Sequence, residues 1–431
     1  MRPLTINLES IVGRPIPAGT KGLPPSAVGE LPRNLGLRGY NLLAGDIPLP
    51  ACVLSREALS HNRATMREFT ERMGVRLAPH GKSTMAPQLF AEQIDDGAWA
   101  MTAATPAHLF AYRSVNISRI LYANQLVDPA AIAFVLDEID KDPAFEFICL
   151  VDSIAGIDIL VDEMRARPPM RPLDVLIEFG VPGARTGVRR KDQAIRLAQH
   201  LSSLDSFLRL RGVEAFEGVV KDGTDAGVRI ITQLLDCLSE TVVALAAEGR
   251  FGALPPIISV GGSTYFGLVA RHFQALPLHA EIILRSGCYL TNDHGMYASS
   301  QQLETDRGRL ALQAPFRPAI EVWAHVQSRP EAGLAILALG KRDISYDIEM
   351  PIPVKWVPRA KLEVQNLGPE FRVDSLNDQH ARLLVPGTHP LDVGDRVALG
   401  CSHPCTTFDK WRSILMVDSA YNIVEVISTL F

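Results

Sequence analysis

The chain has 431 residues, of which 47% are hydrophobic and 21% are charged, and its formal net charge is -5. This composition excludes a mainly disordered chain. It also disfavours a nucleic-acid binder, because 43 basic residues face 48 acidic ones without a basic run. No apolar run approaches the ~18 residues that a membrane span needs, and the N-terminus shows no signal peptide. We therefore expect a cytoplasmic protein without a membrane or nucleic-acid partner.

Residues 1–50 are rich in Pro and Gly, and they predict an irregular arm. After the arm, short β-type runs alternate with helical patterns. Several of these helices have clear start signals, which are Ser55, Thr105-Pro106, Asp128-Pro129 and Ser153, and a long amphipathic helix is predicted over Asp225–Glu248. The eight predicted strands are Val75–Ala78, Trp99–Ala103, Arg119–Ala123, Phe145–Val151, Leu173–Glu178, Val213–Val219, Pro256–Val260 and Ala280–Leu284.

Eight strands separated by helices predict βαβ units and a parallel sheet, which favours a closed (β/α)₈ barrel in an α/β chain. An open doubly wound sheet is the alternative. After residue 300, short runs separated by Pro, Gly, Asn and Asp predict a smaller β-rich domain; they are Ile320–Val326, Leu334–Leu339, Ala381–Val385, Arg396–Leu399 and Ile414–Val417. The predicted division is an arm at 1–50, a barrel at 51–302 and a β-rich domain at 303–431.

Functional groups of such a barrel gather in the loops that follow the strands. Lys82 follows the first predicted strand, where a lysine is able to form a Schiff base. A solvated surface lysine is the alternative reading, and Lys221, after the sixth strand, is a rival on the same grounds. Arg185, between Gly183 and Gly187, suits close contact with a bound ring or anion, and an ordinary flexible loop is the alternative there.

Two consecutive loops near the end of the barrel are rich in small and hydroxyl residues. Backbone N–H groups at such positions bind anions, and barrels often hold phosphate after strands 7 and 8. A tight turn is the alternative. The residues concerned are Gly261, Gly262, Ser263 and Thr264 after the seventh strand, and Gly287, Cys288 and Tyr289 after the eighth.

The β-rich domain contains His403 and Cys405, two positions apart, so that both side chains leave the same side of an extended chain. Imidazole nitrogen and thiolate sulfur are zinc ligands. A complete site needs further ligands, which water or substrate supplies in a catalytic site. A buried structural pair is the alternative.

Six short motifs together resemble fold-type III pyridoxal phosphate enzymes. They are PHGK (79–82), YANQ (122–125), GARTG (183–187), SVGGST (259–264), RSGCYL (285–290) and SHPC (402–405). More narrowly, the chain resembles the D-serine dehydratase (deaminase) and D-threonine aldolase group from about residue 50 to its end. This resemblance implies an alanine-racemase-like barrel with a C-terminal β domain, and a homodimer in which one chain's β domain closes the partner's barrel.

The resemblance also implies roles for the residues. Lys82 is the implied Schiff-base lysine, and the two glycine-rich loops hold the cofactor phosphate. Arg185 lies against the pyridine nitrogen, which it keeps unprotonated, and Gln125 lies beside the ring. His403 and Cys405 bind zinc. D-threonine aldolases use His-x-Asp for their metal, so Cys405 favours the dehydratase branch.

One departure from the pattern concerns substrate choice: Ser83-Thr84-Met85 stands where family members commonly have Thr-His-Lys. The implied reaction is β-elimination from D-serine, or a related D-3-hydroxy amino acid, to a keto acid and ammonia. Lys82 is the implied base, and zinc binds the hydroxyl that leaves. The alternatives are retro-aldol cleavage of D-threonine-type substrates, a racemase, and a non-catalytic protein that binds pyridoxal phosphate.

Overall fold

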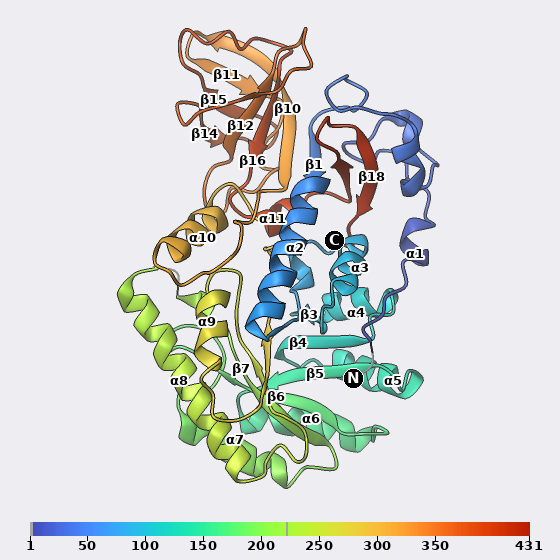
Figure 1. The fold of residues 1–431 in the computed structure, drawn as a ribbon. Coiled ribbons are helices and arrows are strands. Elements are labelled where there is room, and N and C mark those ends of the chain that lie inside the picture. The colour runs from blue at the N-terminus through green and yellow to red at the C-terminus, as the bar shows by residue number, and fades with distance from the viewer. Residues whose placement is uncertain (1–2, 221–222) are drawn as a thin grey trace.

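The computed structural model describes residues 3–220 and 223–431. Figure 1 shows a barrel surrounded by helices below an extended β-rich part, with the N-terminal arm along one side. Lys221 lies outside the described residues, so the structure does not test the rival lysine.

The barrel contains eight parallel strands among the described residues, in the order β2-β9-β8-β7-β6-β5-β4-β3. The ring closes between β2 and β3, because Trp99 N–H donates to Leu77 O at 2.6 Å and His80 forms a parallel bridge with Thr102. The closed barrel is therefore confirmed against the open sheet. The strands are β2 (Arg76–Leu77), β3 (Met101–Ala103), β4 (Arg119–Gln125), β5 (Glu146–Val151), β6 (Leu173–Phe179), β7 (Leu208–Ala215), β8 (Ile257–Ser259) and β9 (Glu281–Leu284).

Helices cover the outside of the barrel, and their starts follow the predicted caps. Side-chain oxygens of Ser55, Thr105, Asp128 and Ser153 each accept a backbone N–H of the first turn. The helices are α2 (Arg56–Met73), α3 (Pro87–Asp95), α4 (Pro106–Ser114), α5 (Pro129–Lys141), α6 (Ile154–Ala166), α7 (Lys191–Ser202), α8 (Asp225–Ala247), α9 (Phe266–Phe273) and α10 (Met296–Asp306). Among the described helices, α8 is long and apolar enough to cross a membrane, but its buried face packs in the barrel's helical layer.

The β-rich part is an antiparallel sheet with one parallel pairing, in the order β13-β12-β16-β10-β1-β17-β18, and β11, β15 and β14 extend it from β10. The five strands predicted after residue 300 are confirmed. The elements are β10 (Ile320–Glu331), β11 (Leu334–Leu337), β12 (Ile352–Val357), β13 (Gln365–Asn366), β14 (Arg372–Leu376), β15 (Ala381–Leu384), β16 (Arg396–Gly400), α11 (Pro404–Phe408), β17 (Ser413–Val417) and β18 (Ile423–Ser428).

The predicted division at residues 51 and 303 needs correction. Strand β1 (Ala51–Ser55) does not belong to the barrel, because it pairs antiparallel with β10 and parallel with β17. Its run of apolar residues is buried on both faces of the β-rich sheet, where alternation gives no signal. The boundary at 302–303 falls inside α10, which continues to Asp306.

The sixth barrel strand is also displaced from its prediction. It spans Leu208–Ala215, and the end of the predicted strand forms a short 3₁₀ helix, η4 (Glu217–Val219). Charged residues alternate with leucines in its first half and conceal the strand. Gly212 interrupts it, and only glycine fits there, because an ideal Cβ would lie 1.8 Å from the carbonyl oxygen of Ile257.

The arm contains one helical turn, α1 (Glu9–Val12), and two 3₁₀ helices, η1 (Pro25–Ala27) and η2 (Pro32–Leu37). It is irregular as predicted, but it belongs to the core. Leu23, Leu35 and Leu42 are buried against Trp323 of β10 and its neighbours. The arm therefore covers one face of the β-rich sheet.

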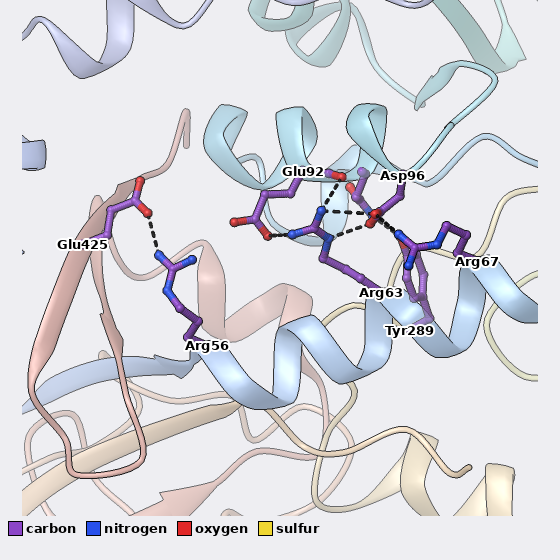
Figure 2. A network of polar contacts seen from close by, with 8 residues as sticks. Arg56, Arg63, Arg67, Glu92, Asp96, Tyr289 and Glu425 are labelled. Atoms are coloured by element: carbon purple, nitrogen blue, oxygen red, sulfur yellow. Dashed lines mark hydrogen bonds and ion pairs between the residues drawn. The ribbon is translucent and has the colours of Figure 1, made fainter. Parts of the chain in front are cut away.

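Helix α2 joins the two parts of the molecule through arginines. Figure 2 shows Arg63 pointing to Glu92 and Asp96 at α3, at 2.8 and 2.6 Å, while Arg56 reaches Glu425 of β18 at 3.0 Å. Arg67 adds a bond to Asp96 at 2.9 Å. The first turn of α2 is thus tied to the β-rich sheet and its middle to the barrel.

Candidate active site

A cavity of about 240 Å³ lies at the C-terminal end of the barrel strands. Of the predicted set, Lys82, Arg185 and Gly262 line it, and the structure therefore brings these three together. Other lining residues are His80, Ala104, Ala123, Asn124, Glu178, Thr186, Glu214, Phe216 and Arg285.

Lys82 sits in a short 3₁₀ helix, η3 (Gly81–Ser83), directly after β2. Its side chain is exposed to the cavity, which fits a nucleophilic amine better than a buried core position. The neighbouring His80 Nδ1 is buried and has no hydrogen-bond partner in the described part of the chain. Burial lowers the pKa of His80 well below its ordinary value, so this ring is neutral and able to bond a ligand in the cavity.

Charged side chains at the ends of neighbouring strands form the wall of the cavity. Arg285, after β9, pairs with Glu214 of β7 and donates to Ser259 O at 2.7 Å. Burial raises the pKa of Glu214 to about 8, against the opposing attraction of Arg285. Its Oε2 has no partner among the described residues. Glu214 Oε2 is therefore, after His80 Nδ1, a second buried polar atom of the cavity wall without a hydrogen-bond partner in the described part of the chain.

Arg185 lies in the loop after β6, with its guanidinium carbon 4.8 Å from the centroid of the Phe216 ring. Gln125, at the end of β4, donates its side-chain amide to Glu178, which also accepts from Thr186 at 2.8 Å. Gln125 itself lies outside the cavity lining. Its neighbour Asn124 lines the cavity instead.

A buried carboxylate holds the first glycine-rich loop. Glu217 accepts the backbone N–H of Gly262 at 2.7 Å and that of Gly261 at 3.2 Å. Gly261 has φ +107°, a conformation that favours glycine. These two N–H groups are therefore already used within the chain and are not free for a phosphate.

The next backbone donors are free. Within the residues that the structure describes, the amides of Ser263, Thr264 and Gly287 have no hydrogen-bond acceptor. Ser263 and Thr264 lie just before α9, whereas Gly287 lies in the loop after β9. Ser263 Oγ accepts from Cys288 N–H at 3.2 Å, which holds the two loops together. Three unused N–H groups at two adjoining loops fit a phosphate.

Two residues predicted for the phosphate rim have side chains directed elsewhere. The Tyr289 hydroxyl accepts from Gln93 at 3.1 Å, and its ring lies near the arginine cluster of α2 (Figure 2). The Cys288 sulfur lies 3.5 Å from that of Cys405 and 3.6 Å from Ser83 Oγ. Hydrogen bonding from Cys405 lowers the pKa of the Cys288 thiol to about 6.

The predicted metal residues stand at the start of α11. His403 Nδ1 bonds Asp347 Oδ2 at 2.5 Å, which leaves Nε2 for another partner. Cys405 follows within the first turn and contacts Cys288, which fits a sulfur-binding metal. Within the described chain, however, no three His, Cys, Asp or Glu side chains already converge as a metal site.

Five further residues of the site carry no recognised motif in the sequence: Glu178, Glu214, Glu217, Arg285 and Asp347. Glu178, Glu214 and Arg285 share a signal, because each is a charged residue at the end of a barrel strand, where functional residues gather. The displaced sixth strand concealed this position for Glu214. The sequence gives no comparable signal for Asp347, which reaches His403 from a loop.

Residues 319–417 match the family described as "Putative serine dehydratase domain". The chain is 23% identical to a D-threonine aldolase of Arthrobacter sp over 374 residues, which are 86% of this chain and 89% of the relative. It is 27% identical over 253 residues to the D-threo-3-hydroxyaspartate dehydratase of Delftia sp. (strain HT23), over 57% of this chain and 61% of that protein.

The fold agrees with the crystal structure of a D-threonine aldolase from Filomicrobium marinum. The TM-score is 0.75 at 23% identity, covering 91% of this chain and 97% of the other. An alanine-racemase-like barrel with a C-terminal β-rich part is therefore confirmed. The resemblance to the D-serine dehydratase and D-threonine aldolase group is confirmed as well.

Proposed function

We propose that this chain, whose relatives include a D-threonine aldolase and a D-hydroxyaspartate dehydratase, is a pyridoxal-phosphate-dependent lyase of D-3-hydroxy amino acids. The specific reaction that we propose is β-elimination from D-serine, or from a related D-3-hydroxy amino acid, to a keto acid and ammonia. The observation that carries this proposal is the cavity lined by Lys82, Arg185 and Gly262, whose next two residues in sequence, Ser263 and Thr264, have unused backbone N–H groups within the described part of the chain.

Pyridoxal phosphate fits the residues of this cavity. The free amides of Ser263, Thr264 and Gly287 suit its phosphate, and Lys82 suits its aldehyde. When bound, the cofactor withdraws electrons from the α-carbon of the amino acid. His80 Nδ1 and Glu214 Oε2, which have no hydrogen-bond partner among residues 3–220 and 223–431, would find one in a bound ligand.

The residues of the chain then divide the remaining work. Lys82 Nζ, at the rim of the cavity, takes the α-proton of the substrate. Arg185 is always charged and donates only, so its contact with a ring nitrogen keeps that nitrogen unprotonated. Glu178 accepts from Thr186, the residue after Arg185 in its loop, and from Gln125 at the end of β4, and this bond to Thr186 limits the freedom of the loop.

Departure of the β-hydroxyl requires stabilisation, because hydroxide is a poor leaving group. His403 and Cys405 would hold a zinc ion, which would supply a Lewis acid for this hydroxyl. Asp347 bonds the His403 ring at Nδ1 and thereby leaves Nε2 for the ion. The enamine released after loss of water hydrolyses to the keto acid and ammonia.

The test is an assay for pyruvate from D-serine and for glycine from D-threonine, with and without a chelator. We expect pyruvate, loss of turnover on chelation, and loss of both turnover and cofactor absorbance in Lys82→Ala. Lys141→Ala, which removes an exposed lysine paired with Glu138, is the matched control and stays active. Glycine instead of pyruvate would identify an aldolase, and cofactor binding without turnover on either substrate would refute the lyase.

A further inference from the structure

Two thiols from separate parts of the chain meet beside the cavity. Cys288 follows β9 of the barrel and is 5% exposed, whereas Cys405 belongs to α11 of the β-rich part. Their sulfurs are 3.5 Å apart, and Ser83 Oγ, adjacent in sequence to Lys82, lies 3.6 Å from Cys288 Sγ. This places the pair in contact with the turn that bears Lys82 rather than in a remote part of the core.

The distance between the two sulfurs distinguishes a disulfide from a pair of thiolates that bind one metal ion. A disulfide requires about 2.05 Å. Two thiolates on one tetrahedral zinc, with Zn–S bonds of about 2.3 Å, lie about 3.8 Å apart. The observed 3.5 Å is close to the second value and far from the first. The sulfurs are therefore already placed to share an ion with small adjustments.

We propose that Cys288 is a metal ligand, which together with Cys405 and His403 forms a Cys₂His zinc site. This rests on the metal role given to His403 and Cys405 in the proposed function. The His403 ring turns toward the sulfurs when the ion binds, with Asp347 still on Nδ1. A Cys₂His set keeps the fourth position open, as catalytic zinc sites do, and this position takes the substrate hydroxyl.

A second thiolate changes what the ion is able to do. One thiolate with one imidazole leaves a net charge of +1 on zinc, whereas two thiolates neutralise it. The neutral site binds the ion more firmly and is a milder Lewis acid. It also links the barrel to the β-rich part through the metal itself, because Cys288 and Cys405 come from different parts.

The experiment compares Cys288→Ser and Cys405→Ser with Cys237→Ser, a partly exposed thiol on α8, in protein purified under reducing conditions. Zinc affinity is measured by competition with a chromophoric chelator, and the thiolate-to-cobalt charge-transfer band is recorded after loading with Co²⁺. We expect Cys288→Ser and Cys405→Ser each to lower affinity about tenfold or more and to halve the band. Cys237→Ser leaves both unchanged.

A second measurement requires no variant. In the wild-type protein, bound zinc protects both Cys288 and Cys405 from alkylation, as mapped by mass spectrometry, and chelation exposes both. Protection of Cys405 alone, or a full cobalt band in Cys288→Ser, would overturn the proposal. A Cys288–Cys405 disulfide in the zinc-loaded protein would also overturn it. These measurements do not depend on turnover. If the protein binds zinc through two thiolates but has no lyase activity, the proposed function is refuted and the proposed metal site stands.

Discussion

Gly287 is a position where one added methyl group tests the arrangement of the active-site loops. An ideal Cβ there would lie 2.6 Å from both His80 O and Ser83 Oγ. Ordinary contacts begin at 3.4 Å, so Gly287→Ala requires a shift of roughly 0.8 Å. His80 O is backbone at the start of the turn that bears Lys82, so this shift moves the lysine. Overpacking of this kind costs about 1–3 kcal/mol.

The matched control is Gly387→Ala, because its ideal Cβ meets nothing within 4 Å and its φ is not positive. We expect Gly387→Ala to stay within about 1 kcal/mol of the wild type. Stability is measured by urea unfolding, and cofactor affinity by titration with pyridoxal phosphate followed by absorbance. We expect Gly287→Ala to lose about 1–3 kcal/mol and to bind the cofactor more weakly. Equal stability and affinity in both variants would refute the packing argument for Gly287.

Three other perturbations follow from the contacts. The folded pKa of Glu214, about 8, exceeds its ordinary 4.5, so its contribution to stability is complete below pH 4.5 and is lost as the pH rises through 8. Between these two pKa values the free energy of unfolding of the wild type falls by up to about 1.4 kcal/mol per pH unit, and Glu214→Gln removes this dependence. Urea unfolding at pH 5 to 8 that gives the same pH dependence for the wild type and the variant would contradict this. Arg63→Met leaves Glu92 without its ion-pair partner and Asp96 with Arg67 alone, and it costs about 1–3 kcal/mol. The half-exposed Arg67→Met leaves Asp96 paired with Arg63 and costs at most about 1 kcal/mol. Equal losses of stability in thermal unfolding of the two variants would contradict the central place of Arg63 in this network (Figure 2). Asp347→Asn weakens zinc binding about 10–100-fold, and an unchanged metal titration would argue against orientation of His403.

Much of the barrel was predictable because its local signals agree. Polar caps such as Ser55 and Thr105 begin helices, and short apolar runs between helices mark parallel strands. Lys82, Arg185 and Gly262 were found because they directly follow those strands, and barrel geometry brings all strand ends to one cavity.

The remaining features depend on contacts between distant segments. Strand β1 is a short apolar run whose place beside β17 is fixed only by tertiary packing. Cys288 was assigned to the phosphate loop, whereas its sulfur turns to Cys405, more than a hundred residues away in sequence. Asp347 and His403 likewise make contact although they are 56 positions apart in sequence. No local pattern encodes such pairs, because their partners are chosen by the arrangement of two separate parts.

Strand β1 has a consequence for synthesis and for engineering. An inner strand of the C-terminal sheet is made before the barrel, and its neighbours β10 and β17 are made after it. During synthesis on the ribosome, the apolar strand β1 stays unpaired until nearly the whole chain has emerged. This delay favours slow folding and chaperone binding. An excised fragment of residues 319–417 lacks both this strand and β18, so we expect it to aggregate rather than fold as an independent domain.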